Sequence, residues 1–77
     1  TLFPYTTLFR LYLVIYEQGE TSWGAYSPDL PGVAVVADTR DEVERLMRAA
    51  IPLHLDALRA DGLAVPLPRN SAGVVAA

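Results

Sequence analysis

The sequence Ser-Pro-Asp-Leu-Pro-Gly at positions 27–32 separates two short apolar segments, 23–27 and 33–37, and predicts a rigid corner between two strands. Each proline fixes its own φ near about −65° and favours an extended conformation for the residue before it. Gly32 can adopt the positive φ that closes such a corner. Because a stiff loop holds its side chains in place before a partner arrives, this corner is a candidate for recognition.

The segments on either side of the corner predict an antiparallel sheet. Residues 10–17 carry apolar side chains on both faces of an extended chain, which is typical of a central strand. A polar turn containing Gly19 follows at 18–21, so that 23–27 returns as the second arm of a hairpin. We expect 33–37, which lacks polar alternation, to form a third strand whose second face is buried or at an interface.

A long amphipathic helix is predicted from Thr39 to Ala60. Thr39 and Glu42 form a capping box, in which the threonine hydroxyl accepts the Glu42 amide and the glutamate side chain returns to the Thr39 amide. Gly62 stands where a C-terminal cap is expected. At about 100° per residue, the apolar side chains fall on one stripe, opposite the charged ones. The stripe comprises Val43, Leu46, Met47, Ala50, His54, Ala57 and Leu58.

Charged pairs and one proline modify this helix. Asp41 with Arg45 and Glu44 with Arg48 are predicted to pair across one helical turn. Pro52 removes the hydrogen bond to the Arg48 carbonyl, so we expect the axis to bend there.

Beyond the helix, two prolines make residues 63–68 extended, and 72–76 is predicted to add a short fourth strand. The predicted fold is therefore α+β. It consists of a small, mainly antiparallel sheet in the order β-β-β-α-β, a partial ribonuclease H-like topology, covered on one face by one helix. The other face of the sheet has no predicted cover.

Length and composition limit what this chain can do alone. A core built from 77 residues seldom supplies more than about 3–5 kcal/mol, and the sequence has no cysteine for disulfides or a metal cluster. We therefore expect a homo-oligomer or a partner protein to add stability, and no metal or cofactor. The net charge is −3, from nine acidic residues, six arginines and no lysine. Nucleic-acid-binding proteins usually carry a positive charge, so this negative charge favours a protein that binds over a basic partner protein.

The N-terminal residues 1–10 fit the rest poorly and are interpreted as a non-native or disordered extension, which leaves 11–77 as the domain. They lack the basic start and small-residue cleavage site of a secretory signal. Apolar runs are far shorter than the roughly 18–20 residues that span a membrane, so a cytoplasmic location is expected.

Several motifs occur in an order and spacing that resemble the N-terminal domain of HicB-type antitoxins, over about residues 11–76. They are Tyr12 to Tyr16, Gly24-Ala25-Tyr26, Pro28 to Gly32, Asp38-Thr39, Glu42, His54-Leu55, Gly62 and Val65-Pro66-Leu67-Pro68. The resemblance implies a non-enzymatic antitoxin of the bacterial cytoplasm that inhibits a cognate HicA-type RNA-cleaving toxin by occluding its active surface. Many relatives carry a DNA-binding domain after the Pro-x-Pro segment. Only nine residues follow Pro68 here, so we expect no nucleic-acid binding by this chain.

The residues predicted to contact the partner follow from the stiff corner rather than from the resemblance. They are Tyr26, Asp29, Leu30 and Pro31, with Trp23 behind them. Aromatic side chains are common interface anchors, and a carboxylate can accept hydrogen bonds from a basic partner.

Two other functions remain open from the residues. One is a self-associating domain without a toxin, which would pair its bare sheet face with a second copy. The other is a degenerate ribonuclease H-like nuclease, which needs several carboxylates around metal ions; Asp29, Asp38 and Glu42 are the candidates, in separate predicted roles. His54, the single histidine, is interpreted as a packing residue on the helix stripe.

Overall fold

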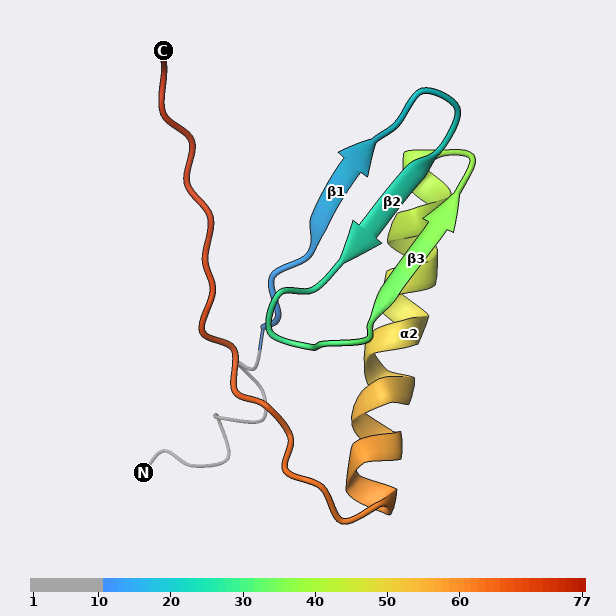
Figure 1. Cartoon of the computed structure of the whole chain (residues 1–77), viewed down its shortest axis with the longest axis vertical. Helices are drawn as coiled ribbons and strands as arrows, with labels where there is room; N and C mark the ends of the chain where they lie inside the picture. The colour runs from blue at the N-terminus through green and yellow to red at the C-terminus, as the bar shows by residue number, and fades with distance from the viewer. Residues whose placement is uncertain (1–10) are drawn as a thin grey trace.

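The computed structural model describes residues 11–77, in which three strands precede one helix. The strands are β1 (Ile15–Gln18), β2 (Trp23–Tyr26) and β3 (Ala34–Ala37), and the helix is α2 (Arg40–Ala60) (Figure 1). The predicted α+β class is confirmed. The predicted extension at residues 1–10 lies outside the described residues.

The sheet is antiparallel with the order β1-β2-β3, and Tyr16, Ala25 and Val35 are paired across it. The first strand is shorter than the predicted 10–17. Its ladder ends at the pair of Ile15 with Tyr26, because the next residue, Ser27, has already turned into the corner.

Two overlapping turns build the corner at residues 27–32. The Leu30 amide donates to the Ser27 carbonyl at 3.1 Å, and the Val33 amide donates to the Leu30 carbonyl at 3.1 Å. In the second turn, Pro31 is followed by Gly32 with φ of 92°, which is the arrangement of a type II turn. The predicted positive φ of this glycine is confirmed.

The ends of α2 follow the predicted capping residues. Thr39 has extended dihedrals, and its Oγ1 accepts the Glu42 amide at 3.2 Å. At the other end, Gly62 has φ of 72°, its amide donates to the Arg59 carbonyl, and the Leu63 amide donates to the Leu58 carbonyl. This pair of hydrogen bonds is a Schellman motif, which satisfies carbonyls that a helix end leaves free.

The ion pairs on α2 differ from the predicted ones. Arg40 pairs with Glu44 at 3.7 Å, and Arg45 pairs with Glu42 at 3.9 Å instead of with Asp41. Because Glu42 reaches toward Arg45, its carboxylate serves this surface pair, whereas the predicted box had it returning to the Thr39 amide. Such exposed pairs contribute little to stability, so the exchange of partners has little consequence.

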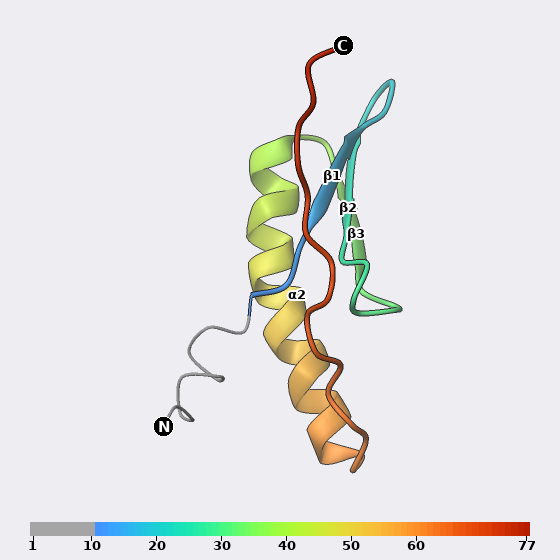
Figure 2. The ribbon, with the colours of Figure 1, turned by 90° about the vertical axis from the view of Figure 1, so that its left-hand side faces the viewer.

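Pro52 lies inside α2 without ending it, and Figure 2 shows the helix axis changing direction along its length. The set of buried residues on the helix also differs from the predicted stripe. Val43 and Met47 are buried as predicted, but the third buried helix residue is Leu55, while Ala57 is exposed. Leu55 lies about 80° from Met47 on a straight helix, so the buried surface of the helix is wider than the predicted stripe on that side.

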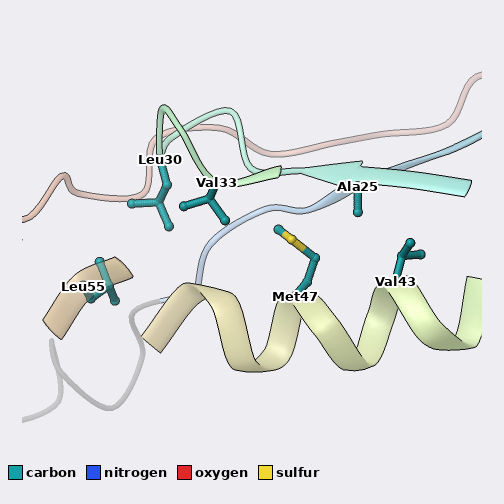
Figure 3. Packing of buried hydrophobic residues seen from close by; sticks show 6 residues of the cluster. All are labelled: Ala25, Leu30, Val33, Val43, Met47 and Leu55. Carbon is teal, nitrogen blue, oxygen red and sulfur yellow. The ribbon is translucent and has the colours of Figure 1, made fainter. Parts of the chain in front are cut away.

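The core lies between α2 and one face of the sheet. Ala25, Leu30 and Val33 point from the sheet and corner toward Val43, Met47 and Leu55 on the helix (Figure 3). The helix packs mainly over β2 and β3 and touches β1 less, and the opposite face of the sheet carries no helix in the described chain (Figure 2).

The predicted fourth strand over 72–76 does not form. Residues 63–77 are extended without ladder pairing, although two contacts tie this segment to the body. The Tyr12 hydroxyl donates to the Pro66 carbonyl, and Asn70 binds Asp29. Residues 71–77 are all exposed, and Val74 and Val75 are fully or almost fully so.

No helix in residues 11–77 is long and apolar enough to cross a membrane.

Candidate functional site

Asp29 is held inside the corner. It is only 8% exposed, and its carboxylate accepts the backbone amide of Asn70 at 3.1 Å and the Asn70 side-chain amide at 2.5 Å. Burial by itself raises the pKa of Asp29, but the backbone amides of Asn70 and Arg69, the Asn70 side chain and the Arg69 charge outweigh it, so the pKa lies below its ordinary value. The ionised carboxylate therefore fastens the C-terminal segment to the corner.

Leu30 and Pro31 have opposite positions in the corner. Leu30 is fully buried in the core, whereas Pro31 is exposed. The prediction that the Leu30 side chain contacts a partner is therefore corrected, because its surface is already used against the helix. Pro31 remains accessible beside it.

Tyr26 lies on the face of the sheet that points away from α2. Ala25 is buried against the helix, and neighbouring residues of a strand point to opposite faces, so Tyr26 faces outward; it is 38% exposed. The ladder places its cross-strand neighbours on the same side. We call this surface the open face; it consists of Ile15, Glu17, Gly24, Tyr26, Ala34 and Val36.

The open face is mainly apolar and has a hollow at the end near the β1–β2 hairpin tip, where Gln18, Gly19 and Ser22 also line it. Val36 is 71% exposed, and Glu17 carries the only charge among the six residues. Gly24 has no side chain, and a hollow of about 400 Å³ opens there between Glu17 and Val36. A Cβ at Gly24 would meet only the Val35 carbonyl, at 3.8 Å, so the strand itself has room for a larger residue.

Trp23 lies on the other face of the sheet, as a supporting residue. The Arg40 guanidinium lies 4.6 Å from the centre of the Tyr16 ring and 5.8 Å from that of Trp23, which is within the range of a cation–π contact. These two rings and the arginine cover the end of the core near the start of α2.

Acidic side chains gather at one end of the open face. The ladder pairs Gln18 with Trp23 and Trp23 with Ala37, so the β1–β2 hairpin tip and the β3–α2 turn meet at the same end of the sheet (Figure 1). The exposed acidic residues on the sheet side are Glu17, Glu20 and Asp38. Asp41 and Glu42, next to the exposed Arg40, belong to the first turn of α2 behind the sheet.

Sequence reasoning chose Tyr26 but missed Ile15, Gly24 and Val36 on the same surface. Alternate residues of a strand lie on the same face of the sheet, so these three residues could have been grouped with Tyr26 once the pairing register was known. Ala25 supplies that reference, since a small buried residue in the middle strand fixes which side faces the helix.

His54 and the carboxylates give no metal site in the described part of the chain. His54 is half-buried, and its Cε1 would lie 3.9 Å from a Cβ added at Gly32, so the imidazole packs beside the corner. Among residues 11–77, no three histidine, cysteine, aspartate or glutamate side chains lie close enough together to hold a metal ion. The nuclease alternative therefore has no supporting site within them.

Comparison with protein families matches residues 12–77 to the family described as HicB_like antitoxin of bacterial toxin-antitoxin system. Comparisons with curated proteins and with solved structures gave no match.

Proposed function

Because this chain belongs to the HicB-like antitoxin family of bacterial toxin-antitoxin systems, we propose that it binds and inhibits a HicA-type RNA-cleaving toxin through its open face. The antitoxin covers the toxin surface that holds RNA and does no chemistry itself. Both proteins act in the bacterial cytoplasm.

The observation that carries this proposal is the uncovered apolar surface around Tyr26. Val36, Tyr26 and Ile15 form adjacent parts of one sheet face, and Pro31 stands exposed in the corner that follows β2. Exposed aromatic and aliphatic side chains are typical of the centre of a protein interface. The hollow lies beside them, at the hairpin end of the face. Asp29 and Leu30 support this surface from inside.

Charge supports the choice of a basic partner. The chain has a net charge of −3, and the exposed Glu17, Glu20 and Asp38 lie at the hairpin end of the open face. An RNA-cleaving protein needs cationic side chains to hold phosphates. An acidic border next to an apolar centre therefore competes with RNA for the same surface and guides the two proteins together.

The test is capture of the protein encoded by the adjacent gene, followed by an RNA-cleavage assay with and without this chain. We expect a stable complex and loss of cleavage at equimolar antitoxin. Replacing the exposed Val36 by aspartate places a charge in the centre of the face, and Tyr26→Ala removes its aromatic side chain. Each is expected to weaken inhibition by at least about tenfold.

Gly24→Val provides the sharpest variant, because it fills the hollow at a position where a strand accepts a β-branched residue. We expect unchanged thermal stability and weaker toxin capture. Leu53→Asp is the matched control, since Leu53 is 68% exposed on α2, which packs on the opposite side of the sheet; Leu53 lies near Ala34 at the β3 edge but far from the hairpin-end hollow at Gly24. Normal inhibition by Val36→Asp and Gly24→Val, with loss in Leu53→Asp, would contradict the proposed surface.

A further inference from the structure

Gly24 lies within the central strand of the sheet, where folding does not require a glycine. Its φ is not positive, since among residues 11–77 the glycines with positive φ are Gly32 and Gly62. A Cβ at Gly24 would have its nearest contact, the Val35 carbonyl oxygen, at 3.8 Å, so a side chain would also fit. Glycine weakens a strand interior and often marks a place where a ligand or another chain approaches closely.

The missing side chain opens a space in a row of three residues across the open face. The ladder pairs Gly24 with Glu17 on one side and with Val36 on the other. Neighbouring strands are about 4.8 Å apart, so Glu17 and Val36 face each other across roughly 10 Å. Atoms in contact lie about 4.0–4.5 Å apart, so one side chain that enters this hollow touches both of its walls.

The two walls of the hollow differ in chemistry. Val36 forms an apolar wall, and it is 71% exposed. On the other side Glu17 carries a negative charge, and Gln18 and Ser22, whose side chains contain oxygen acceptors, line the hairpin end. A side chain that suits both walls therefore has an apolar stem and a positively charged head that donates several hydrogen bonds.

The Glu17 carboxylate has no cation beside it in the described chain. All ion pairs among residues 11–77 lie within α2, and the Arg40 guanidinium lies over aromatic rings on the other face of the sheet. The exposed Glu20 and Asp38 add negative charge at the same end of the open face. The charge of Glu17 is therefore available to a cation from another molecule.

We propose that the hollow beside Gly24 holds one arginine side chain of the toxin, with its guanidinium on the Glu17 carboxylate and its methylene stem against Val36. Arginine suits the site better than lysine, because the planar guanidinium presents its N–H donors in a fixed fork that matches a carboxylate. An arginine held in this way cannot bind an RNA phosphate at the same time, so the contact itself excludes RNA. This inference rests on the proposed function, because it names the group of the basic partner that the open face recognises.

The first experiment tests the hollow without a toxin. Amide chemical shifts of the ¹⁵N-labelled chain are followed while N-acetylarginine amide is added, with N-acetylcitrulline amide, a neutral analogue of similar shape, as the control ligand. We expect shifts at Glu17 and Gly24, a dissociation constant in the millimolar range, and binding of the citrulline compound that is at least about fivefold weaker. Glu17→Gln is expected to remove this difference, and Glu20→Gln, outside the lining of the hollow, to keep it. Equal binding of the two compounds to the wild type would refute the site.

The second experiment measures the dissociation constant of the complex with the protein encoded by the adjacent gene. Glu17→Gln is expected to weaken the complex about tenfold and to reduce its salt dependence. Glu20→Gln is the matched control; it removes a charge outside the hollow and is expected to weaken the complex less than about threefold. Both side chains are exposed, so the thermal unfolding midpoint is expected to stay unchanged.

A double-mutant cycle connects the charge with the space. Gly24→Val fills the hollow and excludes the arginine, so Glu17→Gln is expected to cause little further loss in the double variant Glu17→Gln/Gly24→Val. Losses that add fully would overturn the inference, because the carboxylate and the hollow would then contact different groups of the toxin.

Substitutions in the toxin identify the side chain that enters the hollow. Each arginine is replaced in turn by methionine, which keeps an apolar stem and removes the charge. For one arginine we expect about a tenfold loss against the wild-type antitoxin and little loss against Glu17→Gln. If no arginine shows this coupling, the inference is wrong.

This inference and the proposed function fail in different ways. If Val36→Asp and Tyr26→Ala weaken toxin capture while Glu17→Gln behaves like Glu20→Gln, the open face is the toxin surface and the arginine site is refuted. If the arginine compound binds at Glu17 and Gly24 but the toxin is not captured, the hollow does bind arginine and the toxin is the wrong partner.

Discussion

Substitutions of Leu30 show whether this corner residue serves the folding of the domain or the binding of a partner. The side chain is fully buried, between the corner and the helix residues Met47 and Leu55 (Figure 3). Leu30→Val removes one methylene, which costs about 0.8 kcal/mol of transfer free energy. Because the neighbouring side chains fill the space left by this methylene only in part, we expect the free energy of unfolding to fall by about 1 kcal/mol.

Thermal unfolding followed by circular dichroism measures this change. For a domain of this size, 1 kcal/mol lowers the unfolding midpoint by about 4–8 °C. The matched control is Leu67→Val, the same substitution at a residue that is 61% exposed in an extended segment, and we expect little change there. Leu30→Ala is expected to cost about 2–5 kcal/mol, enough to unfold most of a domain with so small a core.

The reasoning is refuted if Leu30→Val and Leu67→Val shift the midpoint equally. It is also refuted if Leu30→Val keeps the wild-type midpoint but weakens toxin capture, because Leu30 would then contact the partner and not the core.

Three further predictions concern the caps and turns. Thr39→Ala removes the acceptor of the Glu42 amide and is expected to destabilise the domain by about 1 kcal/mol, measured by urea unfolding, while Thr39→Ser retains most of the stability. Gly32→Ala forces a φ of 92° on a side chain and is expected to cost about 1–2 kcal/mol, whereas Gly73→Ala, in open space, is expected to be neutral. The folded-state pKa of Asp29 is lowered, so its ionised carboxylate stabilises the fold fully above the unfolded pKa of about 3.9. This stabilisation is lost as the pH falls through the lower folded-state pKa. Urea unfolding midpoints measured between pH 7 and pH 2 are expected to show this loss in the wild type and a smaller loss in Asp29→Asn.

Local chemistry explains why some elements could be predicted from the sequence. The corner, the start of α2 and its end are each specified by one residue type with a distinct backbone preference or hydrogen-bonding group. Gly32 and Gly62 have positive φ, and Thr39 accepts the amide three residues later, as their positions indicated. These features depend on neighbours within a few residues, so no tertiary information is needed.

The features that were missed depend on contacts between distant parts of the chain. Asp29 and Asn70 are separated by 41 positions, and no local pattern relates them. Leu30 lies in a turn, where the side-chain direction follows from how the corner packs on the helix rather than from a period of 2 or 3.6 residues. Leu55 is buried in the same cluster as Leu30, so its burial follows from how the corner packs on the helix.

The contact between Asp29 and Asn70 explains why Asp29 is not needed at the proposed interface. Asn70 occupies the carboxylate through its backbone and side-chain amides, so Asp29 fixes the course of the segment that follows α2. The partner contact is therefore assigned to the exposed residues of the open face, Tyr26 and Val36, and the corner contributes through the exposed Pro31.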